Sequence, residues 1–215
     1  MTSATASSSS RPGAAPAAGL FRAEDGLLRC EWCRATPAYQ RYHDEEWGFP
    51  VTDDRRLFEK ICLEGFQAGL SWLTILNKRE AFRKAFANFD AKKLAAFDES
   101  DVERLLQDAG IVRHRGKIEA AIANARATVA LRSSGEPLHE LVWAHRPAVH
   151  PAPATPADWR SETPESAALA KRLRGAGFRF VGPTTVYAAM QACGVVNDHL
   201  AACFVRDDVE RARAG

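Results

Sequence analysis

The sequence has no long apolar run, no secretory signal and no strong excess of charge of either sign. No stretch approaches the ~18 apolar residues that span a bilayer. The first 20 residues are rich in Ser, Ala and Pro but lack the apolar block of a signal peptide. The formal net charge of the 215 residues is only +2. Any contact with DNA must therefore come from a local basic surface.

Several catalytic motifs are also absent. The sequence contains no phosphate-binding P-loop, no dinucleotide-binding glycine pattern and no nucleophilic-serine motif. Its five cysteines are an odd number in an ordinary composition of 46% hydrophobic and 26% charged residues. These thiols predict metal ligation or core packing rather than a disulfide framework.

Helical periodicity dominates the chain, which predicts an all-α fold without strands. Helices are expected over residues 53–63, 72–86, 98–107, 115–131, 165–174 and 183–193. The two glycines within 64–69 predict a turn between the first two helices.

The composition also predicts how the chain is divided. We expect a disordered tail over 1–26, one domain over 27–206 with a proline-rich connection at about 146–164, and a C-terminal tail over 207–215.

His199 and Cys203 are the clearest candidates for metal ligands. Residues four apart on a helix share one face, so this imidazole and thiolate can bind one ion. Near the front, His43 with Cys30 or Cys33 would complete a Cys2His2 set of the kind that binds structural zinc. Spacing does not choose between the two cysteines, and all of these residues could instead be ordinary packed side chains.

Four aromatic residues near one carboxylate suggest a pocket for a flat base. Tyr39, Tyr42, Trp47 and Trp72 flank Glu64 in the sequence. Stacking is worth ~1–3 kcal/mol per base, and the ring quadrupole attracts a cationic base. Each aromatic alone is more often a core residue, and Glu64 could be a solvated helix end. Only the combination predicts a pocket.

The segment Gly177–Gly182 predicts a hairpin that could bind phosphate. It precedes a helix, whose first amides are free to bind an anion. Four cations precede or lie within this hairpin: Lys171, Arg172, Arg174 and Arg179. A second basic run occupies residues 113–117. Either run could also be an ordinary solvated surface.

Five separate stretches together resemble the DNA-3-methyladenine glycosylase I family. They run in the family's order within about residues 28–206 and comprise 39–48, 57–65, 67–72, 107–118 and 180–199. The chain departs from the family pattern in its Ser/Pro-rich extension and in Pro183. The resemblance implies an all-α helix-hairpin-helix fold, with a structural zinc joining the N- and C-terminal segments.

The resemblance also implies a role for each candidate residue. The zinc ligands would be Cys30, His43, His199 and Cys203, which excludes Cys33. The base pocket would comprise Glu64, Tyr39, Tyr42, Trp47 and Trp72. The residues that contact DNA would be Gly69, Leu70, Ser71, Arg179 and Gly182, with Leu70 as the wedge where the lesion leaves the duplex.

The implied activity is hydrolysis of the N-glycosidic bond of 3-methyladenine. The methyl group makes adenine cationic and weakens this bond, so we interpret Glu64 as a recognition group rather than a general base. No lysine is clearly placed beside the pocket, which predicts a monofunctional enzyme without a Schiff base. Asp198 is expected to orient local structure.

Two other functions fit parts of the sequence. One is a zinc-stabilised DNA-binding module without activity, and the other is a hydrolase whose zinc keeps one coordination position open. The resemblance implies damaged double-stranded DNA as the partner, no membrane association, a monomer, and a cytoplasmic location in contact with the nucleoid.

Overall fold

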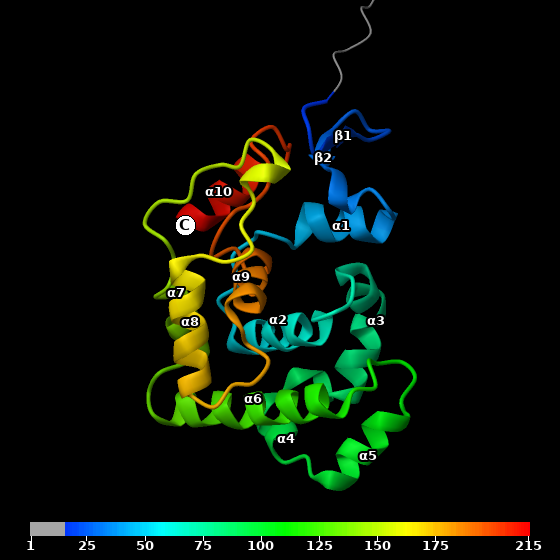
Figure 1. Cartoon of the computed structure of the whole chain (residues 1–215), viewed down its shortest axis with the longest axis vertical. Coiled ribbons are helices and arrows are strands. Elements are labelled where there is room, and N and C mark those ends of the chain that lie inside the picture. The colour runs from blue at the N-terminus through cyan, green and yellow to red at the C-terminus, as the bar shows by residue number, and fades with distance from the viewer. Residues whose placement is uncertain (1–15) are drawn as a thin grey trace, which may run out of the picture.

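The protein is a helical bundle with one small sheet at its N-terminal end (Figure 1). The structure is a computed structural model and describes residues 16–215. Its elements are β1 (Leu20–Arg22), β2 (Leu28–Cys30), α1 (Pro37–Glu45), α2 (Asp54–Gln67), α3 (Trp72–Ala85), α4 (Ala91–Ala95), α5 (Glu99–Gln107), α6 (Arg115–Ser133), α7 (Leu138–Trp143), α8 (Pro164–Gly175), α9 (Pro183–Ala192) and α10 (Arg206–Ala214). Within residues 16–215 we find no helix with the length and apolar character needed to cross a membrane.

All six helices expected from the sequence are present. Five of them begin at a side chain that accepts a hydrogen bond from an amide of the first turn, namely Asp53, Ser71, Asp98, His114 and Thr163. Such caps stabilise a helix start by about 1 kcal/mol each. The mostly helical fold expected from the sequence is therefore confirmed.

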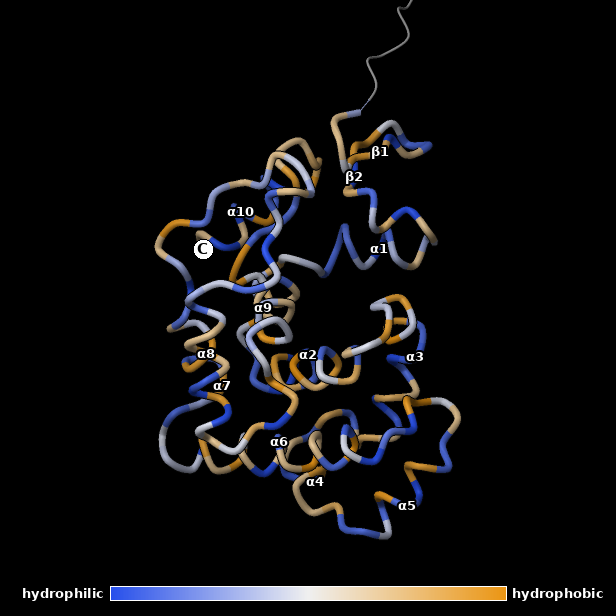
Figure 2. The backbone as a smooth tube through the Cα atoms, in the orientation of Figure 1, coloured by the Kyte–Doolittle hydropathy of each residue, from blue (hydrophilic) through white to orange (hydrophobic). Residues whose placement is uncertain are grey.

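The main hydrophobic core holds α2 rigidly. Helix α2 contacts α3, α6, α7 and α9, and hydrophobic and hydrophilic residues alternate along it (Figure 2). The rings of Phe66 and Phe82 lie 4.6 Å apart, and those of Phe86 and Phe89 are stacked at 5.8 Å. Burying each such ring contributes roughly 1.5–3 kcal/mol. This packing fixes the helix that carries Glu64.

The turn expected over residues 64–69 begins later than predicted. Helix α2 continues through Gly65 and ends at Gln67, because Leu63 and Phe66 remain buried in the core. Gly65 lies against the hairpin segment, where a Cβ would make an ordinary van der Waals contact with the Cβ of Phe180 at 3.5 Å. The turn itself follows at Gly69, whose φ is +80°.

The folded region extends beyond the expected bounds at both ends. Residues 20–22 and 28–30 pair as an antiparallel hairpin, so the expectation of no strands is wrong there, as is that of a tail continuing to residue 26. Strands of three residues are too short to show alternation. The tail expected over 207–215 is helix α10, which buries Val209 and Arg213. The part of the expected N-terminal tail at 1–15 lies outside the described residues.

The proline-rich connection is mostly irregular, as expected, with one turn of 3-10 helix at Pro156–Asp158. It is nevertheless packed against the rest of the molecule. The carbonyl of Pro153 accepts a hydrogen bond from the amide of Ala201 at 2.8 Å. A Cβ at Gly19 would lie only 2.2 Å from Pro156, so this glycine permits the close approach of the connection.

Candidate active site and metal cluster

One cavity brings together the carboxylate and all four aromatic residues expected from the sequence. Its volume is about 290 Å³, and it is lined by Trp32, Tyr39, Tyr42, Trp47, Glu64, Gln67, Trp72, Trp159, Ala188 and Gln191. Helices α1, α2, α3 and α9 and the proline-rich connection each contribute to it. Trp32, Trp159 and the two glutamines were not predicted.

Capped helix starts position several of these side chains. The Thr36 hydroxyl accepts a hydrogen bond from the Tyr39 amide at 3.1 Å, which begins α1 with a tyrosine facing the cavity. Ser71 caps α3 in the same way and places Trp72 at the first helical position. The indole N–H of Trp72 is buried and has no hydrogen-bond partner within residues 16–215. A ligand that fills the cavity would find few polar groups but several ring faces.

Trp32 is the centre of the aromatic wall. Its ring makes edge contacts at 4.9 Å with Tyr39, 5.0 Å with Trp47 and 6.4 Å with Tyr42. The sequence offered a signal, because Trp32 lies between Cys30 and Cys33, next to the expected metal ligands.

Glu64 is buried at the end of the cavity. Only 6% of its surface is exposed, and its carboxyl group accepts no hydrogen bond from any described residue. Burial raises the pKa of Glu64 to about 8, and the nearby charge of Lys60 opposes this shift. Burial in this cavity therefore favours the protonated form of the carboxyl group.

Lys60 lies behind the aromatic wall rather than in the cavity. It is buried one helical turn before Glu64, and its ammonium lies 5.6 Å from the centre of the Tyr42 ring. No lysine is among the described residues that line the cavity. The expectation that none lies beside the pocket is therefore refined, because a buried ammonium lies near the ring of Tyr42.

Four buried side chains next to this wall form a cluster with the geometry of a metal site. The ligand atoms of Cys30, His43, His199 and Cys203 all lie within 4.8 Å of one another. His43 Nε2 and His199 Nδ1 are 3.1 Å apart, and Cys203 Sγ lies 3.4 Å and 3.6 Å from these two nitrogens. Tetrahedral zinc places its sulfur and nitrogen ligands roughly 3.3–3.8 Å apart. The cluster therefore could hold such an ion.

Outer hydrogen bonds orient both imidazoles of the cluster. His43 Nδ1 lies 2.7 Å from Asp44, which in turn accepts from Arg29. His199 Nε2 lies 2.9 Å from the carbonyl of Trp47. Each ring thus directs its second nitrogen into the cluster, which is the usual arrangement around a metal-binding histidine.

The thiol of Cys203 belongs to the cluster, whereas that of Cys33 does not. A hydrogen bond from Cys30 lowers the pKa of the Cys203 thiol, which favours the thiolate that a metal requires. Cys33, the rival ligand, lies outside the cluster and its thiol donates to the carbonyl of Cys30 at 3.1 Å. The ring of Trp47 packs against His199 at 4.6 Å, so the cluster also supports a wall of the cavity.

The expected hairpin connects α8 to α9 and is held from below by α6. The side chain of Asn124 accepts from the amide of Arg179 at 2.7 Å and donates to its carbonyl at 3.2 Å. Phe180 follows with a φ of +55° and is 41% exposed. Gly182 then caps α9 without a side chain, which leaves the amides of Thr184 and Thr185 uncapped, while Pro183 has no N–H.

The basic residues near the hairpin are only partly available to a ligand. Arg172 pairs with Glu136, and Arg115 of the second run pairs with Glu99 and Glu103. The Lys117 ammonium donates to the carbonyls of Phe66 and Ala68 at 2.9 and 2.6 Å, capping the end of α2. Lys171, Arg174 and Arg179 remain exposed and make no ion pair within the described chain. The first basic run is therefore the better surface for a phosphate.

The loop that joins α2 to α3 carries Leu70, the residue that the sequence predicts as a wedge. Leu70 is 42% exposed between Gly69 and the capping residue Ser71. Because Trp72 follows at once, this exposed side chain lies beside the residues that line the cavity.

Asp198 is a structural centre rather than a free acid. Its carboxylate accepts hydrogen bonds from His150 at 2.6 Å, Tyr187 at 2.7 Å and Gln191 at 2.7 Å. The expectation that it orients local structure agrees with these contacts.

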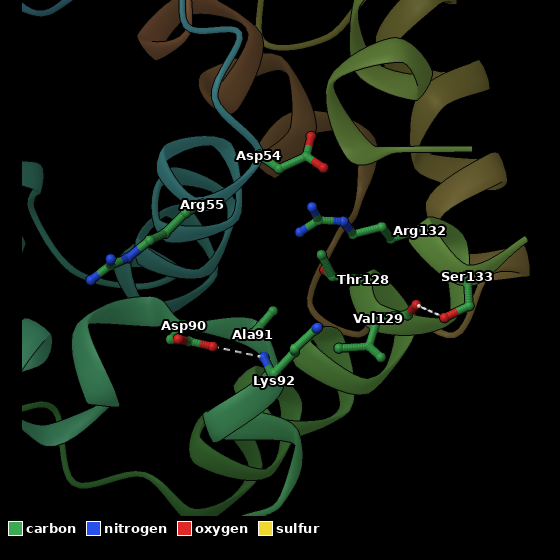
Figure 3. Close-up of a pocket in the computed structure, with 9 residues that line it drawn as sticks. All are labelled: Asp54, Arg55, Asp90, Ala91, Lys92, Thr128, Val129, Arg132 and Ser133. Carbon is green, nitrogen blue, oxygen red and sulfur yellow. Dashed lines mark hydrogen bonds between the residues drawn. The ribbon is translucent and has the colours of Figure 1, made fainter. Parts of the chain in front are cut away.

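A second cavity of about 480 Å³ lies between α2, α4 and α6, away from these residues (Figure 3). Arg55, Lys92 and Arg132 line it, but its two acids are already engaged. Asp54 accepts from the amide and ring of His139, and Asp90 caps α4. It contains no aromatic ring, so the smaller cavity is the better candidate for binding a base.

The fold and the site define a helical protein with an aromatic, carboxylate-containing cavity supported by a Cys2His2 cluster. Comparison with known proteins agrees with this description. The family model described as methyladenine glycosylase matches residues 32–206. DNA-3-methyladenine glycosylase 1 of Escherichia coli strain K12 is 54% identical over 180 residues, which cover 82% of this chain and 96% of the relative. DNA-3-methyladenine glycosylase of Haemophilus influenzae is 47% identical over 181 residues, 81% of this chain and 96% of the relative.

Solved structures agree with the sequence relatives. A crystal structure of 3-methyladenine DNA glycosylase I has a TM-score of 0.80 and 53% identity, covering 82% of this chain and 98% of that one. A variant of 3-methyladenine DNA glycosylase I solved in complex with 3-methyladenine has a TM-score of 0.79 and 32% identity, covering 83% and 97%. The chain belongs to the methyladenine glycosylase family, and it is an enzyme of that family.

Proposed function

We propose that this enzyme hydrolyses the N-glycosidic bond that joins 3-methyladenine to the sugar in alkylated double-stranded DNA. The observation that carries the proposal is the buried carboxyl group of Glu64 in a cavity whose other walls are mainly aromatic. Family membership and the related structure with 3-methyladenine bound support the same substrate.

The enzyme reaches its substrate by turning the damaged nucleotide out of the helix. A base stacked in a duplex cannot enter a cavity, so the nucleotide must rotate outward. Leu70, with Gly69 and Ser71 on either side of it in the loop, would fill the space that the base leaves in the duplex. In this proposal α8, the hairpin and α9 form a helix-hairpin-helix unit, in which Arg179 and the amide of Gly182 contact the phosphates.

The cavity distinguishes the lesion from adenine by charge. The methyl group on N3 makes the purine cationic, and both aromatic faces and a carboxylate attract a cation. A cation next to Glu64 also lowers the pKa of its carboxyl group, so binding of the lesion releases a proton from Glu64. Neutral adenine gains neither of these attractions. It also does not lower the pKa of Glu64, so the carboxyl group next to it would keep its proton.

Bond cleavage then needs little proton transfer to the base. The leaving group is already cationic, so Glu64 acts as a recognition and electrostatic group while water attacks the sugar carbon. Tyr39, Tyr42, Trp47 and Trp72 hold the ring. Because no lysine is among the described residues that line the cavity, no imine forms in this proposal and the enzyme is monofunctional. Trapping an enzyme–DNA adduct with borohydride would overturn this step.

We further propose that Cys30, His43, His199 and Cys203 hold one zinc ion with a structural role. Four protein ligands leave no open position for a reacting water, so the ion would supply stability by joining the two ends of the chain. Its ligands pack on Trp47, which links the cluster to the cavity wall. We also propose that the protein acts as a monomer in the cytoplasm, on DNA of the nucleoid.

The direct test is release of free bases from methylated duplex DNA, resolved by base identity. We expect 3-methyladenine as the main product and no unmodified adenine. Equal release of adenine, or release of neither base, would contradict the proposal.

A substitution at Glu64 separates the enzyme from a DNA-binding module without activity. Glu64→Gln keeps the size of the side chain and removes its charge, so we expect base release to fall by about 100-fold while DNA binding is retained. A module that only binds DNA would release no base before the change either.

A further inference from the structure

Trp159 is the one wall of the cavity that comes from the proline-rich connection. This connection leaves α7, rises alongside α10 towards the β1–β2 hairpin and returns to α8 (Figure 1). Trp159 lies on its return path, half-buried, and lines the same cavity as Glu64 and Trp72. No family stretch described above includes this residue.

Several contacts fix the position of Trp159. Its indole N–H donates to the backbone carbonyl of Asp198 at 2.9 Å. The carboxylate of the same Asp198 accepts from His150, at the other end of the connection, at 2.6 Å. Between these points the connection is held by the Pro153 carbonyl and by the close approach of Pro156 to Gly19. One hydrogen bond therefore fixes the indole itself, and the other contacts fix the segment that carries it.

We propose that Trp159 is a specificity-determining residue that contacts the expelled methylated purine, and that His150 and Asp198 position it. The inference rests on the proposed function and adds a wall to its binding site. A held indole offers a ring face with little loss of conformational freedom on binding. The cationic ring of the lesion interacts with that face more strongly than neutral adenine does.

The test compares Trp159→Leu and Trp159→Phe with the wild-type enzyme. The readouts are kcat/KM for release of 3-methyladenine from methylated duplex DNA and affinity for undamaged duplex DNA. We expect Trp159→Leu to lower kcat/KM by about tenfold without changing the affinity for undamaged DNA. Trp159→Phe keeps a ring face and should retain most of the activity.

Trp143 provides a matched control. It is also a half-buried indole whose N–H donates to a backbone carbonyl, that of Val51 at 2.8 Å, but it does not line the cavity. Trp143→Leu should lower the melting temperature without lowering kcat/KM for the lesion. If the two leucine variants lose activity in proportion to their loss of stability, the role of Trp159 is only structural and the inference is wrong.

His150 tests the positioning role separately. His150→Gln removes the hydrogen bond across the connection, and we expect a reduction in kcat/KM of about threefold. This effect should disappear in the Trp159→Leu background, because the two residues act through one wall. Additive effects would contradict positioning. A wild-type enzyme that releases no 3-methyladenine would overturn the proposed function together with this inference, whereas an active wild type with a fully active Trp159→Leu variant overturns the inference alone.

Discussion

The molecule has two hydrophobic clusters of unequal size, and the cavity lies where they meet. The large one is built by α2 to α9. The small one has six buried members, namely Leu20, Cys30, Leu200, Cys203, Val205 and Val209. Trp72 packs on the large cluster, and Trp32 and Trp159 pack on the small one. The two clusters therefore supply different parts of the same site.

The large cluster holds the carboxyl group of the site, and the small cluster holds part of its aromatic wall. Glu64 belongs to α2, which packs against α3, α6, α7 and α9 of the large core, where a buried carboxyl group can be held at a cost in stability. Much of the aromatic wall belongs to the small cluster, which joins segments that are far apart in the sequence. A core of six residues stabilises little by itself, and small cores commonly depend on metals. The Cys2His2 cluster lies where that support is needed.

Removing the metal site should have the largest effect and should act on the small cluster. We expect Cys203→Ala, or chelation of the purified protein, to lower the melting temperature by on the order of 10 °C, because the proposed zinc would contribute directly to folding. Metal content and thermal unfolding measure the two changes. Cys33→Ala is the control, since this buried thiol lies beside the cluster without joining it. Equal losses from the two variants would show that only packing matters.

Substitution of Glu64 should have the opposite effect on stability. The pKa of Glu64 is about 8 in the folded state against an ordinary value of 4.5, so the folded state binds this proton more tightly. Stability is therefore lost as pH rises from about 4.5 to 8. Glu64→Gln removes that loss, and we expect the variant to be more stable than wild type by up to a few kcal/mol above pH 8.

The same comparison at low pH gives the control. Near pH 4 Glu64 is protonated in both states, so the two proteins should unfold at similar denaturant concentrations. If the free energies of unfolding of the two proteins differed by the same amount at every pH, the pKa of Glu64 would be the same in the folded and unfolded states. The large core would then not raise the pKa of this carboxyl group.

Activity should follow the same titration. If the carboxylate form of Glu64 recognises the cationic base, kcat/KM rises with pH because that form becomes populated in the free enzyme. We expect about a tenfold increase between pH 7 and 9, followed by a plateau. Glu64→Gln should have a flat profile over this range. A decrease of wild-type kcat/KM from pH 7 to 9 would instead indicate that the protonated form is the active one.

The two clusters also differ in how far the sequence predicts them. The longer helices of the large core show strong periodicity and clear caps such as Asp53 and Asp98, so their existence and most of their ends were predictable. The short helices α4 and α7 of the same core were not expected. The small cluster is made by strands of three residues, by α10 and by irregular chain. These depend on long-range contacts such as that of Pro156 with Gly19, which no local pattern reveals.

The site shows the same division. Glu64 and four aromatic residues could be predicted because they lie close together in the sequence. Trp159 could not, because it lies 95 positions from Glu64 in a segment without periodic apolar residues. The second basic run was misleading for a related reason. The ammonium of Lys117 is engaged by carbonyl groups at the end of α2, and only the folded chain brings these together.

The smallest expected effect concerns the hairpin, which depends on the large core alone. Asn124 on α6 bonds both backbone groups of Arg179, so Asn124→Ala should loosen the hairpin, which we propose contacts phosphate, without disturbing the Cys2His2 cluster. We expect affinity for duplex DNA to fall by about 3- to 10-fold, in line with the loss of one or two buried hydrogen bonds. Thr128→Ala is the control, because this buried hydroxyl bonds only within α6. Metal content should stay unchanged in both variants. A loss of metal in Asn124→Ala would show that the two clusters are coupled through α9, and that they should be treated as one folding unit.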